Sequence, residues 1–299
     1  MPYSRDKAAL ALCRQTLSIP DNYLRRMRQP NGRITLDTPD PQQQRLQALL
    51  FDCFFSRGLE HPFDLNGGRS FPDLLAYLSW VAPQNDRLVL QATTAARVTS
   101  YLVPYVRTFT DGSCEVSGIP GLRLERITRK ALVLRHMPTG GRLEIREQIG
   151  EVALRDMQAL LEDEVRVSRQ DENRQDRRQP AWTQEQLTQG EQAVAHHWAP
   201  DATTALRSAL LARANLWWSV YKHRAHLVPA RRSNAERCLH WKSGRSTAEI
   251  GRLLTEGPLK IPEARFTPPY IPGDVGLVHL GEGTLELNGP RAALATLKS

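Results

Sequence analysis

The stretch ALVLRHMPTGGRLEIREQ, residues 131–148, decides the fold of the central part of the chain. Two strand-like runs, ALVLRHM and RLEIREQ, flank the turn residues Pro138-Thr139-Gly140-Gly141. A short connection with glycine between two such runs is typical of an antiparallel pair of strands. The sequence therefore predicts a β-hairpin at this place.

Helices and strands are expected on both sides of this hairpin. In chain order they are a strand at 33–38, an amphipathic helix at 41–57, a strand at 86–92, a short helix at 93–103 and, after the hairpin, a helix at 152–164. This order fits a ferredoxin-like α+β sandwich.

The remaining residues predict an extension and a second domain. Residues 1–32 form a helical N-terminal extension, which Pro20 divides in two. Residues 33–168 are the expected ferredoxin-like domain. Residues 169–299 are the expected second α+β domain, with a helical, arginine-rich insertion at about 181–240. The predicted fold class is therefore α+β with two domains.

Two features organise the predicted second domain. Asp201 is the expected N-cap of a helix that runs to about His226. Near the end of the chain, GLVHL and GTLELNG are expected strands.

Positive charge is concentrated in one segment of the chain. The formal net charge is +8, and residues 207–245 contain nine cations and one acid, Glu236, so this segment alone accounts for it. Trp217, Trp218, Tyr221 and Trp241 lie among these cations. Cations bind phosphates and flat rings stack on unpaired bases, so the segment predicts an RNA-binding surface. The alternative is a solvated helix face with tryptophans in the core.

A second basic cluster lies in VRVSRQDENRQDRRQP, residues 165–180, which is either a solvated linker or a further RNA contact. The predicted RNA-binding residues from both segments are Arg166, Arg169, Arg207, Arg213, Lys222, Arg224, Arg231, Arg232, Arg237 and Lys242.

Several short motifs follow one another in the order of a known family. ITLDTPDPQQQRLQALLFDCFF, GGRSFPDL and DRLVLQA come first, and RSTAEIGRLLTEGPLKI and RFTPPYIPGDVGLV come near the C-terminus. Together they resemble the subtype I-F CRISPR RNA-processing endonucleases over roughly a third of the chain. The resemblance implies a ferredoxin-like domain followed by a second domain whose arginine-rich helix enters the major groove of a repeat hairpin.

The chain departs from this family in two ways. The family carries a catalytic histidine on its first helix, whereas the matching position here is about Phe55. The chain is also longer, with an extension before Arg33 and extra residues between about 181 and 240. In both respects it resembles the corresponding processing subunit of type IV CRISPR systems, in which arginines replace the histidine.

The resemblance implies metal-independent cleavage of a precursor crRNA repeat stem-loop. The ribose 2′-OH attacks the adjacent phosphorus and leaves a 2′,3′-cyclic phosphate and a 5′-OH, and the enzyme orients the 2′-OH and stabilises the phosphate charge. Arginine stays protonated, so cleavage based on arginine should be slow. The candidate catalytic residues are Arg245, Ser246, Tyr270, Arg57, Arg26 and Arg33.

Two of these candidates have a second interpretation. Ser246 opens the sequence S-T-A-E, which is a capping-box pattern. Tyr270 lies beside prolines and could belong to the core. For each arginine, the alternative is a surface salt bridge.

Other classes of chemistry are not expected. The four cysteines are far apart in the sequence, so they predict free thiols in a reducing cytoplasm and no zinc site. No glycine-rich phosphate loop indicates a nucleotide cofactor, and no apolar run indicates a membrane span or a secretion signal. The expected partners are the crRNA repeat hairpin and other CRISPR effector subunits.

Two alternatives to the endonuclease stay open. One is a non-catalytic nucleic-acid-binding subunit of the same kind of complex, which the missing histidine favours. The other is a DNA-binding regulator of a mobile element, in which STAEIGRLLTEG would form part of a helix-turn-helix.

Overall fold

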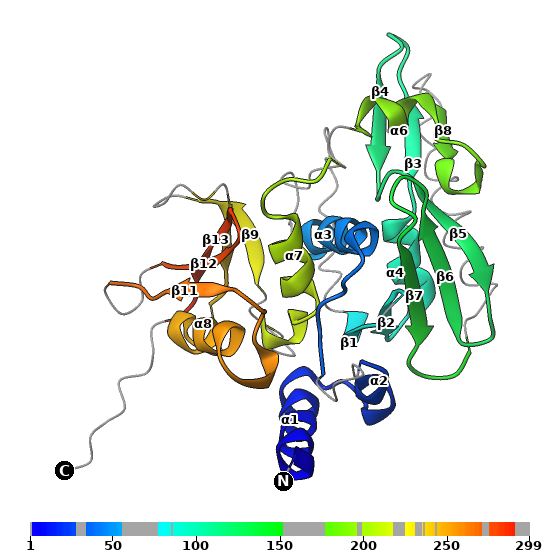
Figure 1. Cartoon of the computed structure of the whole chain (residues 1–299). Coiled ribbons are helices and arrows are strands. Elements are labelled where there is room, and N and C mark those ends of the chain that lie inside the picture. The colour runs from blue at the N-terminus through cyan, green and yellow to red at the C-terminus, as the bar shows by residue number, and fades with distance from the viewer. Residues whose placement is uncertain are drawn as a thin grey trace.

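The computed structural model describes residues 2–27, 34–55, 77–84, 86–151, 177–195, 199–217, 225–230, 235, 237–242, 244–270 and 275–290. Within them, helices and strands mix in the α+β class that the sequence predicts, with three β-sheets (Figure 1). No helix among these residues has the length and apolar character that crossing a bilayer requires.

The first sheet has five strands in the order β1-β2-β7-β6-β5. They are β1 (Leu78–Pro83), β2 (Leu88–Ala92), β5 (Leu122–Ile127), β6 (Ala131–His136) and β7 (Arg142–Glu147). The predicted hairpin is confirmed as β6 and β7, which pair antiparallel. Gly140 in its turn has φ +70°, a backbone conformation that suits glycine because it has no Cβ. Strand β2 pairs parallel to β7, and α4 (Ala95–Leu102) follows β2 as expected.

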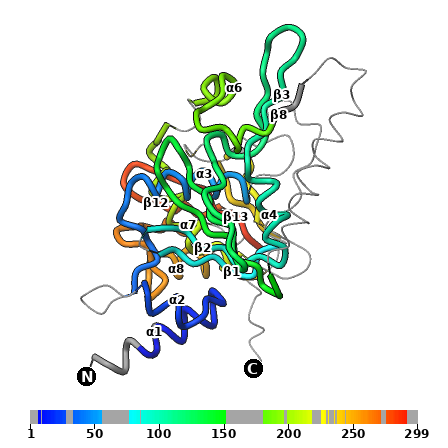
Figure 2. Tube along the Cα trace, turned by 90° about the vertical axis from the view of Figure 1, so that its right-hand side faces the viewer, coloured from blue at the N-terminus to red at the C-terminus, as the bar shows by residue number. Residues whose placement is uncertain are grey.

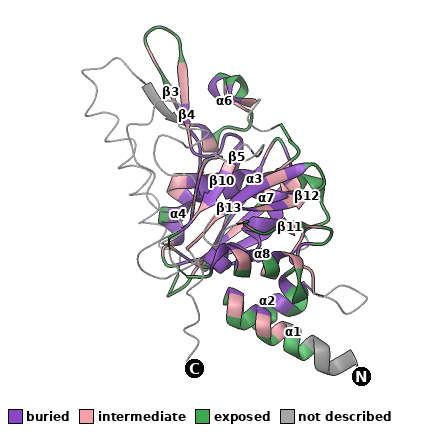
Figure 3. Ribbon diagram, turned by 90° about the vertical axis from the view of Figure 1, so that its left-hand side faces the viewer, coloured by how far each residue is buried: buried purple, intermediate pink, exposed green. Residues whose placement is uncertain are grey.

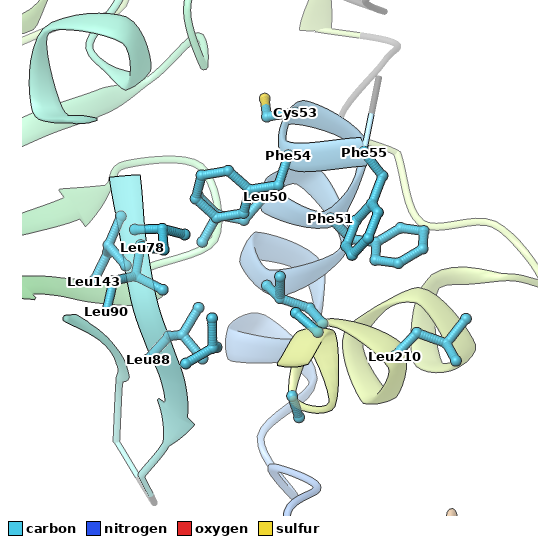
Figure 4. Close-up of a cluster of buried hydrophobic side chains, with 14 of the residues drawn as sticks. Leu50, Phe51, Cys53, Phe54, Phe55, Leu78, Leu88, Leu90, Leu143 and Leu210 are labelled. Carbon is cyan, nitrogen blue, oxygen red and sulfur yellow. The ribbon is translucent and has the colours of Figure 1, made fainter. Parts of the chain in front are cut away.

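Helix α3 (Pro41–Phe55) lies at the centre of the molecule. Its residues from Leu46 onward are buried on every side, as expected for a helix enclosed by other elements. Figure 4 shows the reason: Leu88 and Leu90 of the first sheet lie on one side of α3, and Leu210 of α7 (Thr204–Leu211) lies on the other. One apolar core therefore joins the first sheet to the C-terminal half.

A smaller sheet in the order β4-β3-β8 extends from the first sheet (Figure 2). Its strands are β3 (Tyr105–Thr108), β4 (Cys114–Ser117) and β8 (Arg177–Pro180). The short helix α6 (Gln189–Ala193) packs on β3 and β4. The predicted domain boundary near residue 169 lies outside the described residues, and the chain beyond it first returns to β3 through β8.

A buried ion pair fixes α6 to the first sheet. The Arg123 guanidinium donates to both carboxylate oxygens of Glu191, at 2.8 and 2.9 Å, and Glu191 also accepts from the Gly121 amide. Burial opposes the charged carboxylate, but the hydrogen bonds from Arg123 and the backbone prevail and lower the pKa of Glu191.

The C-terminal sheet has five strands in the order β11-β12-β13-β10-β9. They are β9 (His226–Pro229), β10 (Arg237–His240), β11 (Arg265–Thr267), β12 (Gly276–Leu280) and β13 (Gly283–Asn288). The expected strands GLVHL and GTLELNG are confirmed as β12 and β13. Helix α8 (Thr247–Thr255) contacts β11, β12 and β13. Buried residues concentrate around α3, α7 and this sheet, whereas the part of α1 whose burial is described is mostly exposed or intermediate, except for Cys13 and Leu17 (Figure 3).

The N-terminal extension is helical as predicted and breaks before Pro20. It consists of α1 (Pro2–Leu17) and α2 (Asp21–Arg26). Ser18, between the two helices, has φ +57°, which ends the first helix.

Three expectations about the elements need correction or stay open. The strand expected at 33–38 is wrong: only Ile34 has a bridge, and Thr35 and Asp37 form a side-chain turn instead. The structure confirms the α+β class but not the ferredoxin-like detail, because the chain enters the first sheet only after α3. The helix expected at 152–164 lies outside the described residues.

The long helix expected from Asp201 to His226 is also wrong. Helix α7 ends at Leu211, a 3₁₀ turn covers Ala214–Trp217, and the chain then forms β9. The predicted insertion at 181–240 is therefore not only helical, because it supplies two strands of the C-terminal sheet.

Candidate nucleic-acid interface

The C-terminal sheet has an apolar face and a polar face, which its register defines. Residues paired across strands share a face, and neighbours along a strand point to opposite faces. The apolar face consists of Leu227, Leu239, Leu287, Leu285 and Val278, each at most 2% exposed. Helix α8 packs on this side, where Gly251 lies directly against the Phe266 ring of β11.

The polar face consists of the alternate residues of the same strands. From β9 to β11 they are His226, Val228, Cys238, His240, Glu286, Asn288, Thr284, Leu277, His279, Thr267 and Arg265. None of these belongs to the apolar core, whereas every apolar-face leucine does. This face therefore carries mostly polar and titratable side chains, of which Cys238 and Glu286, in the middle strands, are buried at 3% and 1% exposure. The histidines of β9, β10 and β12 are partly exposed.

Two histidines of the polar face lie side by side. His226 and His240 occupy paired positions on β9 and β10, and both are partly exposed. Their ring centroids are 5.2 Å apart with an interplanar angle of 83°. In the next strand Asn288 is paired with His240, so two imidazoles and a carboxamide form one row across three strands.

The surroundings of His240 favour its neutral form. Partial burial lowers the pKa of His240, and the nearby charge of Lys242 lowers it further. A neutral imidazole has one unprotonated nitrogen, which accepts a proton or a hydrogen bond. His240 is therefore suited to accept a proton near neutral pH.

The third histidine of this face has a different setting. His279 of β12 is hydrogen-bonded to the hydroxyls of Thr267, at 3.3 Å, and Thr284, at 3.0 Å. It is paired with Thr284, four residues before Asn288 along β13. The threonines hold its ring away from the His226–His240 row.

Two cations follow β10 in the chain, and the first of them, Lys242, is close enough to His240 for its charge to act on that ring. Lys242 and Arg245 are both exposed. The indole N–H of the buried Trp241 donates to the Arg245 carbonyl at 2.7 Å, which fixes the backbone between the two cations. Lys242 can therefore bind a phosphate beside His240, and Arg245 adds a second exposed cation three residues further along the chain.

Arg213, a predicted RNA contact, is buried at 1% exposure. It donates to both Asp37 oxygens, at 2.6 and 2.9 Å, and to the carbonyls of Leu259 and Lys260, at 2.5 and 2.9 Å. The prediction of RNA contact is wrong for this residue, because its donors hold α7 against two other segments of the chain.

Arg207 and Arg237 also serve internal contacts. Arg207 is largely buried and forms ion pairs with Asp52 of α3 and with Asp201 at 2.6 Å. Arg237 is partly buried, and its charge acts on Asp52. Burial nevertheless raises the pKa of Asp52, although both arginines act in the opposite direction. The expected role of Arg207 as an RNA contact is therefore replaced by an internal ion pair.

The aromatic residues of the basic segment are core residues where the structure describes them. Trp217 and Trp241 are buried, with ring centroids 6.3 Å apart, and Phe55 packs edge-on against Trp217. The prediction that these two rings stack on bases is wrong, and the alternative of core tryptophans is right. Trp218 and Tyr221 lie outside the described residues.

The catalytic candidates that the structure describes belong to different elements. Arg26 ends α2 in the N-terminal extension, whereas Ser246 caps α8 in the C-terminal half. Tyr270 is 98% exposed, which excludes the alternative of a core residue. Arg26 instead lines a hollow of about 390 Å³ beside β1 and β2, together with Arg87, Asp86 and Glu144.

Ser246 is the N-cap of α8, as its capping-box pattern indicates. Its hydroxyl accepts from the Glu249 amide at 3.3 Å and donates to the Glu249 carboxylate at 2.9 Å, while that carboxylate accepts from the Ser246 amide at 2.7 Å. These bonds lower the pKa of Glu249. They also occupy the hydroxyl that catalysis was expected to use.

The other predicted site residues lie outside the described residues. They are the catalytic candidates Arg33 and Arg57 and the expected RNA contacts Arg166, Arg169, Lys222, Arg224, Arg231 and Arg232. No group of three or more possible metal ligands occurs in the part of the chain that the structure describes.

The sequence analysis does not identify the histidine row, because it predicts a helix from Asp201 to about His226 where the structure has the start of strand β9. HLVP and RCLH place histidines at strand ends, and each strand alternates a core leucine with a polar-face residue. That alternation was the available signal.

No protein-family model, curated protein or solved structure matches this chain at a significant level.

Proposed function

We propose that this protein binds and cleaves CRISPR repeat RNA without a metal ion. Its substrate is the stem-loop of a precursor crRNA, and it stays bound to its product as a subunit of an effector complex. The order of the short motifs along the chain suggests the substrate class, and the basic net charge supports a polyanionic ligand.

The observation that carries the proposal is the histidine row of the polar face, with the charge of the exposed Lys242 acting on His240. The exposed Arg245 follows three residues later in the chain. Cleavage by the 2′-OH needs groups that move protons and cations that hold the phosphate. Imidazoles and exposed cations supply both next to each other. The two cations contribute affinity that depends strongly on salt.

A non-catalytic RNA-binding subunit is the second candidate. It is favoured by Ser246, whose hydroxyl is engaged in a helix cap, and by Arg213, which is buried. Both candidates bind the same RNA, so only a test of cleavage separates them.

A DNA-binding regulator has less support. Within residues 244–270, α8 is followed by a 3₁₀ turn (Gly257–Leu259) and then by β11, so the second helix of a helix-turn-helix is missing there. Within the described part of the chain, α8 packs mainly on strands β11 and β12 of the C-terminal sheet.

The test is incubation of the protein with the hairpin RNA of a CRISPR repeat encoded beside its gene, in EDTA. Discrete fragments ending in a 2′,3′-cyclic phosphate are expected. Tight binding of the hairpin without fragments would favour the non-catalytic subunit. Equal affinity for the hairpin and for duplex DNA at one salt concentration would contradict both RNA candidates.

A further inference from the structure

The histidine row can do more than bind, because it brings two proton-transfer groups to adjacent positions. We infer that His226 and His240 are the acid–base pair of the cleavage reaction, acting on one phosphodiester laid across β9 and β10. This inference rests on the proposed function. It assigns proton transfer to two histidines, which are not among the catalytic candidates of the sequence analysis.

The first support is geometric. The antiparallel register sets the two residues directly opposite one another, with ring centroids 5.2 Å apart. Side chains of paired residues on adjacent strands point the same way, so both rings face the same ligand. On the other side of each strand, Leu227 and Leu239 are anchored in the core at 2% and 0% exposure, which limits strand rotation.

The second support is the difference between the two ends of the row. At one end the chain leads to the cations Lys242 and Arg245, and Asn288 lies beside His240. The titratable and charged groups that surround the pair on this face are Cys238 and Lys242 along β10 and its end, and Glu286 on β13. The lowered pKa of His240 fits the role of proton acceptor, because its imidazole is then neutral near neutral pH.

The reaction step balances with these two residues alone. Neutral His240 accepts the proton of the 2′-OH while the O2′–P bond forms. Protonated His226 donates its proton to O5′ while the P–O5′ bond breaks. The products are the 2′,3′-cyclic phosphate and the 5′-OH, and proton exchange with water restores both imidazoles. Lys242 offsets the negative charge that grows on the phosphate.

The same row is a poor candidate for a metal centre. A metal site needs at least three protein ligands as a rule. Among the residues that the structure describes, no group of three or more His, Cys, Asp or Glu side chains could hold a metal ion.

The test is single-turnover cleavage of the repeat hairpin in EDTA by the full chain. The variants are His226→Gln, His240→Gln and the double variant, and the matched control is His279→Gln on the same face. Each row variant is expected to cleave about 10²–10⁴-fold more slowly, since this is the usual contribution of general acid–base catalysis. The double variant should be little slower than either single one, because the pair acts as a unit.

Binding and folding are measured on the same variants. Affinity for the hairpin with 2′-deoxyribose at the mapped cleavage site should stay within about threefold of that of the starting protein. Thermal unfolding reports whether the fold persists, and His226→Asn and His240→Asn replace any glutamine variant that fails to fold. In the starting protein, the rate should follow a bell-shaped pH profile, and His240→Gln should remove its acidic limb.

Two failures are distinguishable. If the starting protein cleaves the hairpin and both row variants cleave it within about threefold of that rate, the pair is not the acid–base pair and the proposed function stands. If the starting protein binds the hairpin and leaves it intact, the endonuclease function fails and this inference fails with it.

Discussion

The basic segment 207–245 supplies two regions that use positive charge in opposite ways. At the junction of α3 and α7, Arg207 and Arg213 are withdrawn from solvent and paired with Asp52 and Asp37. After β10, Lys242 and Arg245 are exposed, and the charge of Lys242 acts on His240 of the histidine row. A count of charges along the sequence treats these four cations alike, whereas the fold pairs two of them with its own acids.

The difference shows where the charge of this chain is available to a ligand. A buried arginine is satisfied by several acceptors at once, and its removal leaves a carboxylate unpaired, which is buried in the case of Asp52 and partly buried in the case of Asp37. An exposed cation has no such role, and its charge is available to a phosphate. The comparison therefore predicts large losses of stability at the junction and losses of RNA affinity, not stability, beside the row.

Arg213→Ala is expected to have the largest effect. It leaves Asp37 and the carbonyls of Leu259 and Lys260 without their donor, and removing one partner of a buried pair costs about 3–5 kcal/mol. Urea unfolding at pH 7 would measure the loss of free energy. The matched control is Arg245→Ala, which should change stability by less than about 0.5 kcal/mol. Equal losses of unfolding free energy in the two variants would contradict the idea that the junction arginines stabilise the fold and the exposed cations do not.

The next largest effect concerns a buried ion pair away from the junction, between Arg123 and Glu191. Glu191→Gln keeps the shape of the side chain but loses the charge, and we expect a loss of about 1.5–3 kcal/mol at pH 7, as for hydrogen bonds to charged groups. The pKa of Glu191 is lowered in the folded protein, so its stabilisation is complete above the unfolded value. This stabilisation is lost as the pH falls through the pKa of Glu191 in the folded protein.

Urea unfolding of both proteins between pH 7 and pH 3 measures this dependence. The difference in stability between the starting protein and Glu191→Gln should narrow as the pH falls below about 4.3, the ordinary glutamate pKa. A difference that stays constant with pH would contradict the lowered pKa of Glu191.

The elements that the sequence predicted correctly are those with a local signal. The hairpin has its glycine turn, α3 has its apolar residues on a proline-led helix, and β12 and β13 alternate clearly. The prediction of a strand at 33–38 is wrong although ITLD alternates apolar and polar residues. Its polar side chains have other partners: the Thr35 hydroxyl accepts from the Asp37 amide in a turn, and the Asp37 carboxylate accepts from Arg213. That contact joins residues 176 apart, and no pattern within a short window contains it.

The candidate site was predictable only in part, for the same reason. Lys242 and Arg245 are exposed, as the RNA contact predicted for Lys242 and the catalytic role predicted for Arg245 require. Burial of Arg213 depends instead on acceptors from two distant segments, around Asp37 and around Leu259 and Lys260. The capping box at Ser246 was readable because all its partners lie within four residues. The histidine row required the register of β9 on β10, which only the folded sheet supplies.

The third prediction concerns the exposed cations. The double variant Lys242→Ala with Arg245→Ala should bind the repeat hairpin roughly tenfold more weakly, or about 1.4 kcal/mol, near 0.15 M salt. Titrations at several salt concentrations should show a shallower dependence of affinity on salt, because fewer phosphates are neutralised. The matched control is Arg265→Ala at the other edge of the sheet. An unchanged salt dependence in the double variant would mean that these two cations do not contact the phosphates.

The smallest effect is expected for Ser246→Ala, and it tests which of two roles this serine has. Loss of an N-cap side chain costs about 1 kcal/mol, because the Glu249 amide at the start of α8 loses its acceptor. Ser246→Thr, which keeps the hydroxyl, is the control and should lose less stability in thermal unfolding. If Ser246 only caps the helix, single-turnover cleavage by Ser246→Ala stays within about threefold of that of the starting protein at a temperature where both are folded. A loss of about 10²-fold or more would instead mean that the hydroxyl leaves the Glu249 carboxylate to act on the RNA, and α8 would then belong to the site together with the histidine row.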